Sequence, residues 1–277
     1  MKYKLIAVDM DGTLLKNNGE ISEETLSAIQ DICDRGIKFV VSSGRPVPGI
    51  RKYDFLNGID SSAIVYNGGK IIDLKTDKVL FSQGLYPDDG RKILALGDNL
   101  GTTMCIWSDE KLYCNVLNER TEKYKRNSGL EPIQVNATDY EALISQGIAK
   151  ILWYDEIDRV QQFIKIMGKE SFESVSCFTS NPAYLEISNA LVSKAKAMEK
   201  LGEIYGIDRE EMVAVGDGEN DLSMIEYAGL GVAMANASDK VKSKADYITA
   251  SNEDEGVAKV LYKFFSGKED TNENSSN

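Results

Sequence analysis

The sequence predicts an α/β protein whose core is a doubly wound parallel sheet, interrupted by an inserted α+β domain. Two observations predict this fold. Near both ends of the chain, short apolar runs alternate with amphipathic stretches of helical periodicity, the order of βαβ units with right-handed crossovers. In the middle, from about residue 84 to residue 188, the pattern changes to a mixture of helices and antiparallel strands.

The N-terminal elements have the order βαβαβ. Ser22 is a suitable N-cap for the first helix and Gly36 a suitable end for it, because Ser accepts hydrogen bonds from free amides and Gly adopts the left-handed conformation. A second helix is expected after Pro46. Short apolar runs bounded by turn residues predict buried strands at 5–8, 37–41 and 63–66.

The C-terminal part repeats this alternation. Helices are expected at 194–205, 222–228, 238–244 and 255–265, and strands at 212–215, 230–233 and 247–249. Residues 1–83 and 189–266 are therefore expected to form one core. The last residues, 267–277, are rich in Asn, Ser and acidic side chains and are expected to be a disordered tail.

The segment 84–188 is predicted to be a separate α+β domain. A hairpin is expected between residues 102–107 and 111–116. Further strands are expected at 148–154, 175–179 and 184–187.

Composition excludes several kinds of chemistry. The 277 residues include 32 Lys and Arg against 44 Asp and Glu, a net charge of −12, so a broad nucleic-acid-binding surface is not expected. The absence of histidine excludes Ser-His-Asp and Cys-His nucleophiles and His-ligated zinc. The N-terminal apolar run is too short for a signal peptide, and no uncharged run approaches a membrane span. We therefore expect a cytoplasmic protein with no membrane partner.

Polar residues follow three of the predicted strands. They are Asp9 and Asp11, the run Ser42-Ser43-Gly44-Arg45, and the run from Gly216 to Asp221. Each of these also has an ordinary alternative when it is taken alone. Asp9 and Asp11 could belong to an Asp-Gly turn or to the DxD motif of glycosyltransferases. The run that begins at Ser42 could be a Ser-Gly turn, and the run that begins at Gly216 could be a solvated acidic turn. Because ligands bind at the carboxyl ends of parallel strands, the three together favour a common site. Asp9 and Asp217 would supply oxygen ligands suited to Mg²⁺.

Lys194 begins a helix directly after the inserted segment. A lysine at such a place is commonly an exposed, solubilising charge. Its position at the return of the chain to the core also allows a role near the strand ends.

These motifs resemble those of the haloacid dehalogenase superfamily, and their order is similar to the Cof-type branch with a C2B cap. The first motif is 9–13, the second is 43–45, the third is Lys194 and the fourth is 216–221. Further similar runs are 66–69, 185–187, 231–237 and 254–258. The sequence departs from the family pattern in that no glycine flanks Lys194. Lys196 is therefore a minor alternative for the lysine of the third motif.

The resemblance implies a Rossmann-like core, a substrate-selecting cap and a Mg²⁺-dependent phosphatase. Asp9 would be the nucleophile that becomes an aspartyl-phosphate, and Asp11 the general acid and base. The predicted metal residues are Asp9, Asp11 (through its carbonyl group), Asp217, Asn220 and Asp221. The predicted phosphate-binding residues are Met10, Gly12, Ser43, Gly44, Arg45, Lys194 and Asn220, and Ser43 and Lys194 are also counted as catalytic.

The expected partner is a small phosphorylated metabolite, and a monomer or small homo-oligomer is expected. Trp107, Tyr113 and a basic patch (Arg120, Lys123, Lys125 and Arg126) are candidates for substrate selection; a solvated basic helix face is the alternative for the patch. A phosphomutase and a non-catalytic phosphometabolite-binding regulator are the rival functions.

Overall fold

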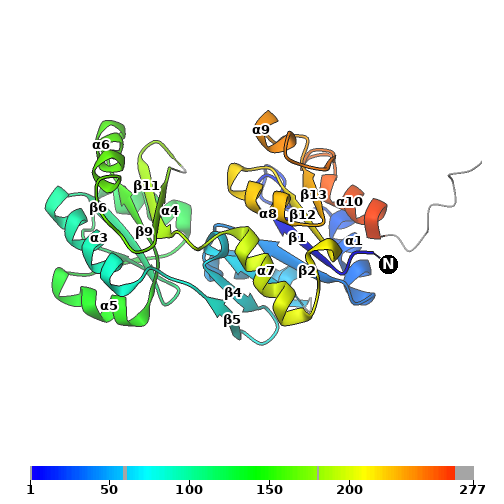
Figure 1. The fold of residues 1–277 in the computed structure, drawn as a ribbon, viewed down its shortest axis with the longest axis horizontal. Helices are drawn as coiled ribbons and strands as arrows, with labels where there is room; N and C mark the ends of the chain where they lie inside the picture. Colours follow the sequence, from blue (N-terminus) through cyan, green and yellow to red (C-terminus); the bar gives the residue numbers. More distant parts are fainter. Residues whose placement is uncertain (1, 59–60, 180, 266–277) are drawn as a thin grey trace, which may run out of the picture.

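The structure, a computed structural model, describes residues 2–58, 61–179 and 181–265. The predicted tail, 267–277, lies outside the described residues. Figure 1 shows two lobes, each built on its own sheet and joined by two crossings of the chain. One sheet has eight strands and the other has six.

The eight-stranded sheet confirms the predicted parallel core. Its order is β14-β13-β12-β1-β2-β3-β4-β5. The strands from β14 to β3 are parallel, and β4 and β5 extend the sheet as antiparallel strands. The bounds are β1 Leu5–Asp9, β2 Lys38–Ser42, β3 Ser62–Val65, β4 Lys70–Asp73, β5 Val79–Ser82, β12 Met212–Gly216, β13 Leu230–Ala233 and β14 Tyr247–Ile248.

Helices cover both faces of this sheet. Alternate residues of β1 separate the two faces, because side chains of a strand point to opposite sides: Ile6 and Val8 pack on one side, Leu5 and Ala7 on the other. The first side is covered by α1 (Glu23–Asp34) and α10 (Gly256–Phe265), and the second by α7 (Lys194–Tyr205) and α8 (Leu222–Tyr227). The shorter helices of this lobe are α2 (Val47–Arg51) and α9 (Asp239–Lys242). The predicted N-cap is also present, since the side chain of Ser22 accepts from the Thr25 amide.

The six-stranded sheet, with its helices, is called the cap below. Its order is β10-β11-β9-β6-β7-β8, and every pair is antiparallel except β7 and β8. The strands are β6 Thr103–Ser108, β7 Lys111–Cys114, β8 Pro132–Gln134, β9 Ile148–Tyr154, β10 Val175–Phe178 and β11 Tyr184–Asn189. The helices are α3 Pro87–Leu100, α4 Glu119–Ser128, α5 Tyr140–Gln146 and α6 Ile157–Met167.

The two faces of the cap sheet differ in what they contact. Ile151 and Trp153 of β9 pack in one cluster with buried residues of α3, α5 and α6. Leu152 and Tyr154, which alternate with them, belong to the cluster that continues into the other lobe. This second face is therefore the one that can border a site between the lobes.

The two chain crossings lie against each other. The side-chain amide of Asn189 donates to the carbonyl oxygen of Gly84 at 3.0 Å. The division of the chain at residues 84 and 188 stays a prediction.

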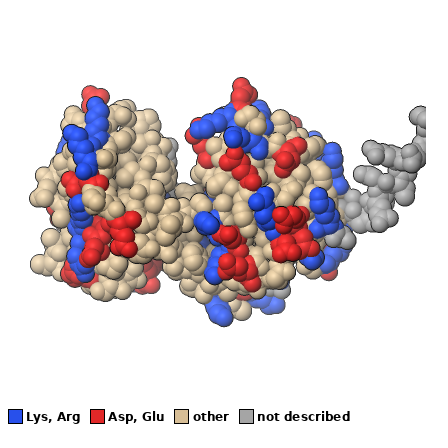
Figure 2. Space-filling view, viewed as in Figure 1, with Lys and Arg blue, Asp and Glu red and all other residues tan. Residues whose placement is uncertain are grey.

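In the part of the chain that the structure describes, no helix has the length and apolar character needed to cross a membrane. Charges of both signs are interspersed on the face shown in Figure 2.

Candidate active site

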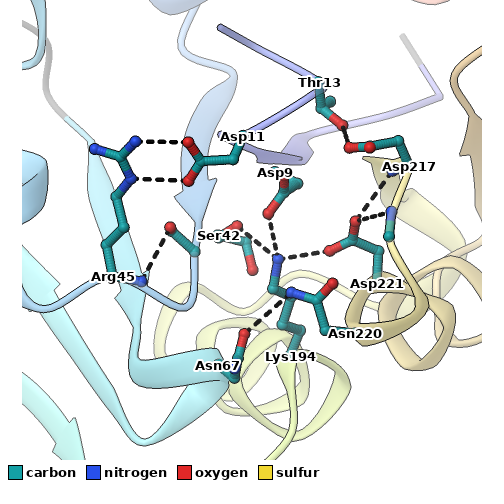
Figure 3. A network of polar contacts seen from close by, with 12 residues as sticks. Asp9, Asp11, Thr13, Ser42, Arg45, Asn67, Lys194, Asp217, Asn220 and Asp221 are labelled. Carbon is teal, nitrogen blue, oxygen red and sulfur yellow. Dashed lines mark hydrogen bonds and ion pairs between the residues drawn. The ribbon is translucent and has the colours of Figure 1, made fainter. Parts of the chain in front are cut away.

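The strand order brings the three predicted motifs to one edge of the core sheet. β1 lies between β12 and β2, with Val8 beside Val215 on one side and Asp9 beside Ser42 on the other. All three strands are parallel, so their carboxyl ends meet at this edge. Figure 3 shows the resulting cluster of polar side chains.

Lys194 lies at the centre of this cluster, at the first residue of α7. Only 1% of the surface of Lys194 is exposed to solvent. Its Nζ atom is 2.5 Å from an oxygen of Asp9, 2.5 Å from an oxygen of Asp221, and donates to the Ser42 carbonyl at 2.9 Å. Burial alone would lower its pKa, but the two carboxylates outweigh burial and raise it. Lys194 is therefore a buried cation that holds two strand ends together.

Lys196 is placed differently. It lies on the exposed side of α7 and pairs with Glu199 at 2.7 Å. Of the two lysines considered from the sequence, the structure brings Lys194 into the cluster and leaves Lys196 outside it.

Asp9 is almost fully buried at the end of β1. Burial raises its pKa to about 7; Lys194 opposes this shift, and the nearby carboxylates of Asp221 and Asp217 add to it. The metal-free Asp9 carboxyl group therefore holds its proton to a higher pH than an exposed aspartate does. A cation bound beside it would compete with this proton.

Asp217 and Asp221 come from the loop after β12. One oxygen of Asp221 accepts from the amides of Asp217 (3.0 Å) and Gly218 (2.9 Å), so this side chain fixes the loop conformation. Asp217 accepts from the Thr13 hydroxyl at 2.6 Å, and burial raises its pKa. Asp9, Asp217 and Asp221 each offer an oxygen, and these oxygens all lie within 4.8 Å of one another.

Asp11 is turned away from these three carboxylates. Its oxygens accept from Nε (2.8 Å) and Nη2 (2.5 Å) of Arg45, and its side chain is 58% exposed. The hydroxyl of Ser43 accepts from the Arg45 amide at 3.2 Å. The second motif thus orients Arg45 toward Asp11.

The other predicted residues surround the cluster. The side chain of Asn220 donates to Asn67 at 3.2 Å. The side chain of Met10 is in the hydrophobic core, not in the site. Gly12 has φ +82°, and a Cβ atom there would lie 2.5 Å from an oxygen of Asp217, so the loop after β1 requires glycine at this position.

Two residues of the site, Asn67 and Thr13, are not predicted as site residues by the sequence. Asn67 lies next to Gly44, where an added Cβ would be 3.0 Å from its side-chain oxygen. Thr13 holds Asp217. Both belong to runs that resemble the family, but their partners are distant in sequence, so no local signal reveals these contacts.

A cavity of about 960 Å³ opens from the cluster toward the cap. Its core side includes Asp9, Asp11, Arg45 and Lys194, and its cap side includes Trp107, one of the predicted selectivity residues. Tyr113 and the basic patch are not among the described residues that line it. Arg120 instead pairs with Asp155 and Glu156, and Lys125 pairs with Glu131.

Comparison with known proteins agrees with the fold and the motifs. A family model described as haloacid dehalogenase-like hydrolase matches residues 6–261. YxeH of Bacillus subtilis is 34% identical over 96% of this chain and 100% of its own. The 5-amino-6-(5-phospho-D-ribitylamino)uracil phosphatase YcsE of the same organism is 34% identical over 93% and 94%. The crystal structure of TM0651 from Thermotoga maritima has a TM-score of 0.84 at 33% identity, over 94% of this chain and 96% of that one.

The fold and the site therefore define a hydrolase with an α/β core and a cap. The chain belongs to the haloacid dehalogenase-like hydrolases, as its motifs predict. Its enzyme class is that of the phosphoric monoester hydrolases.

Proposed function

We propose that this protein is a Mg²⁺-dependent phosphatase that hydrolyses a small phosphate monoester through an aspartyl-phosphate on Asp9. The observation that carries the proposal is the buried Asp9 carboxylate, held 2.5 Å from Lys194 and next to two further carboxylates. Phosphoryl transfer depends mainly on positioning and on compensating charge, and this cluster supplies both.

The residues present fit Mg²⁺. The three clustered carboxylates offer hard oxygen ligands. Asp221 already accepts from two amides and from Lys194, so Asp9 and Asp217, with the carbonyl group of Asp11, would be the direct ligands. Asn220 and Asp221 would order the surrounding water. The bound cation would offset the negative charge of the phosphoryl group.

Asp9 and Asp11 would divide the covalent chemistry. An oxygen of Asp9 attacks phosphorus, the bond to the alcohol oxygen breaks, and a protonated Asp11 gives its proton to that oxygen. Asp11 then takes a proton from the water that attacks the aspartyl-phosphate, which releases inorganic phosphate and restores Asp9. The different surroundings of the two side chains, one buried and one exposed, support this division.

The positive and polar groups at the same edge would bind the phosphoryl oxygens. Lys194, the Ser43 hydroxyl and the Gly44 amide are the proposed donors. Arg45 and Asn220 border the same cavity and would contact the phosphoryl group from its open side. Gly12 and the backbone of Met10 would complete its surroundings.

The substrate is proposed to be a small phosphorylated metabolite: a sugar phosphate, a nucleotide or a cofactor phosphate. The phosphatase YcsE acts on a phosphorylated ribitylamino-uracil by its name, which supports a substrate of this size. A cytoplasmic location and a monomeric or small homo-oligomeric state stay predictions.

Replacing the nucleophile tests the proposal. We expect Asp9→Asn to lower Mg²⁺-dependent turnover of p-nitrophenyl phosphate on the order of 10³-fold or more, with an unchanged circular dichroism spectrum. Asp31→Asn, at an exposed position of α1, is the control. Near-normal turnover by Asp9→Asn would contradict the assignment.

Phosphorus NMR separates the rival functions. Release of inorganic phosphate supports the hydrolase, an isomeric phosphate ester would indicate a phosphomutase, and binding without turnover would indicate a regulator.

A further inference from the structure

The cap side of the cavity carries a buried ion pair. Lys150 of β9 and Glu186 of β11 both line the cavity, and their side chains are only 13% and 9% exposed. The Nζ atom of Lys150 donates to an oxygen of Glu186 at 2.8 Å. Burial alone would lower the pKa of Lys150, but Glu186 and neighbouring groups outweigh burial and raise it, so Lys150 keeps its positive charge.

Strand alternation explains why this pair faces the cavity. Ile151 of β9 and Leu185 and Ile187 of β11 pack in the helix-covered cluster of the cap. Lys150 and Glu186 alternate with them and therefore point to the opposite side. Glu186 lies beside Leu152 in the register of β9 and β11, which makes Lys150 and Glu186 diagonal neighbours.

The ion pair has no net charge, and it supplies the charged side chains on the cap side of the cavity. Among the described residues that line the cavity from the cap, Lys150 and Glu186 are the charged ones. The cations that compensate a phosphoryl group, Lys194 and Arg45, are on the core side. A second anionic group on the substrate, if it reached the cap, would thus meet a lysine already paired with a carboxylate.

The rest of the cap wall is suited to an uncharged molecule with hydroxyl groups. The Ser176 and Ser188 hydroxyls are 3.3 Å apart and both line the cavity. Trp107, Tyr124 and Tyr184 form a row of edge-to-face rings, with centroids 6.4 and 5.9 Å apart. The rings offer an apolar surface for carbon–hydrogen faces, while the serines and the ion pair offer donors and acceptors.

We propose that Lys150 and Glu186 form the specificity site for the leaving group, and that this group is a neutral alcohol with adjacent hydroxyls. Lys150 donates to one hydroxyl oxygen and Glu186 accepts from the next. The ion pair excludes leaving groups that carry a second phosphate or a carboxylate, because Glu186 cancels the charge they would need. This inference rests on the proposed phosphatase function and assigns its substrate selectivity.

The test compares two substrates that differ by one phosphate, fructose 6-phosphate and fructose 1,6-bisphosphate. We expect the wild-type enzyme to have the higher kcat/KM for the monophosphate. Glu186→Gln removes the anion and leaves Lys150 free to pair with the second phosphate, so the ratio of kcat/KM for bisphosphate to monophosphate should rise about tenfold. Turnover of p-nitrophenyl phosphate, whose leaving group has no adjacent hydroxyls, is measured for each variant as the reference for its phosphoryl-transfer activity.

Glu141→Gln is the matched control. Glu141 pairs with Arg91 elsewhere on the cap, outside the residues that line the cavity, so its substitution should leave the ratio unchanged. If Glu186→Gln does not fold, the double variant Lys150→Met/Glu186→Met removes both charges together. It should lower kcat/KM for fructose 6-phosphate about tenfold relative to kcat/KM for p-nitrophenyl phosphate.

An unchanged substrate ratio in a folded Glu186→Gln enzyme, or a wild-type preference for the bisphosphate, would overturn the inference. If the wild-type protein hydrolyses none of the three esters, the proposed function fails. Calorimetric binding of the two fructose phosphates then decides the inference separately. Tighter binding of the monophosphate that reverses in Glu186→Gln supports it, and equal binding overturns it.

Discussion

Glu110, in the turn between β6 and β7 of the cap, accepts a hydrogen bond from the hydroxyl group of Tyr66, in the core loop after β3, at 2.9 Å. The same carboxylate accepts from the Val47 amide at 3.1 Å and pairs with Lys70. Three core elements thus converge on one cap residue. Asp109 and Glu110 both have positive φ, which is the backbone conformation of a tight two-residue turn between antiparallel strands.

Removing this carboxylate should weaken the docking of the cap on the core. We expect Glu110→Ala to lower kcat/KM for phosphate esters about tenfold, because three hydrogen-bonded groups lose their shared acceptor, and to increase the radius of gyration measured by small-angle X-ray scattering. Asp109→Ala in the same turn removes a carboxylate that pairs with Lys111 in an exposed position. Equal effects of the two substitutions would contradict a docking role for Glu110.

Alanine substitutions at Gly12 and Gly19 distinguish the cost of a strained backbone from the cost of a steric clash with a neighbouring side chain. Both have positive φ, +82° and +81°, but only at Gly12 would a Cβ meet Asp217; at Gly19 nothing lies within 4 Å. Alanine at either position should lower the free energy of unfolding by about 1 kcal/mol. Only Gly12→Ala should also weaken the Mg²⁺ dependence of turnover, measured by metal titration. Unchanged Mg²⁺ activation in Gly12→Ala would argue against Asp217 as a ligand.

Lys194 and Lys196 form a second matched pair. Lys194→Met leaves Asp9 and Asp221 without their shared buried cation, which should cost about 3 kcal/mol of the free energy of unfolding and abolish turnover. Lys196→Met removes an exposed charge and should change neither. Urea unfolding of the metal-free proteins measures the difference, and similar curves for both variants would contradict the assigned role of Lys194.

Mg²⁺ affinity should depend on pH through Asp9. The raised pKa of about 7 means that a proton occupies the carboxylate below this pH and competes with the cation. The apparent affinity should therefore fall by up to about tenfold for each pH unit below 7 and level off above it, as measured by calorimetry. Asp11→Asn, which alters an exposed carboxylate, should keep this profile. A flat profile between pH 6 and 8 would count against Asp9 as a direct ligand.

The core strands could be predicted because β1, β2 and β12 are short, have a continuous apolar run in their interior and are followed by polar turns. The hairpin of β4 and β5 was not predicted. Its outer strand is exposed at both ends, so it has no run of buried residues that a sequence pattern could reveal. In the cap, β8 has three residues, too few for any periodicity.

The location of the site could be predicted from the three motifs that follow the parallel strands, more than from any single residue. Lys194 could be read either as an exposed helix residue or as part of the site, because its burial depends on a contact distant in sequence. A contact distant in sequence also lies directly beside Lys194. Gly68 has φ +110° and packs so closely on the carbonyl oxygen of Ser193 that a Cβ atom would lie 2.2 Å from this oxygen. Similarly, the ion pair of Lys150 and Glu186 joins residues 36 positions apart, and each alone reads as an isolated charge in a strand.

The hydrogen bond between Asn189 and Gly84 places the two ends of the intervening segment next to each other. A segment whose ends meet can be removed, exchanged or replaced by a short linker without pulling the remaining chain apart. The eight strands of the core sheet in the described part of the chain all lie outside this segment. A single insertion or exchange event can therefore replace the whole cap, while the strand ends that bring Asp9, Ser42 and Gly216 together keep their positions.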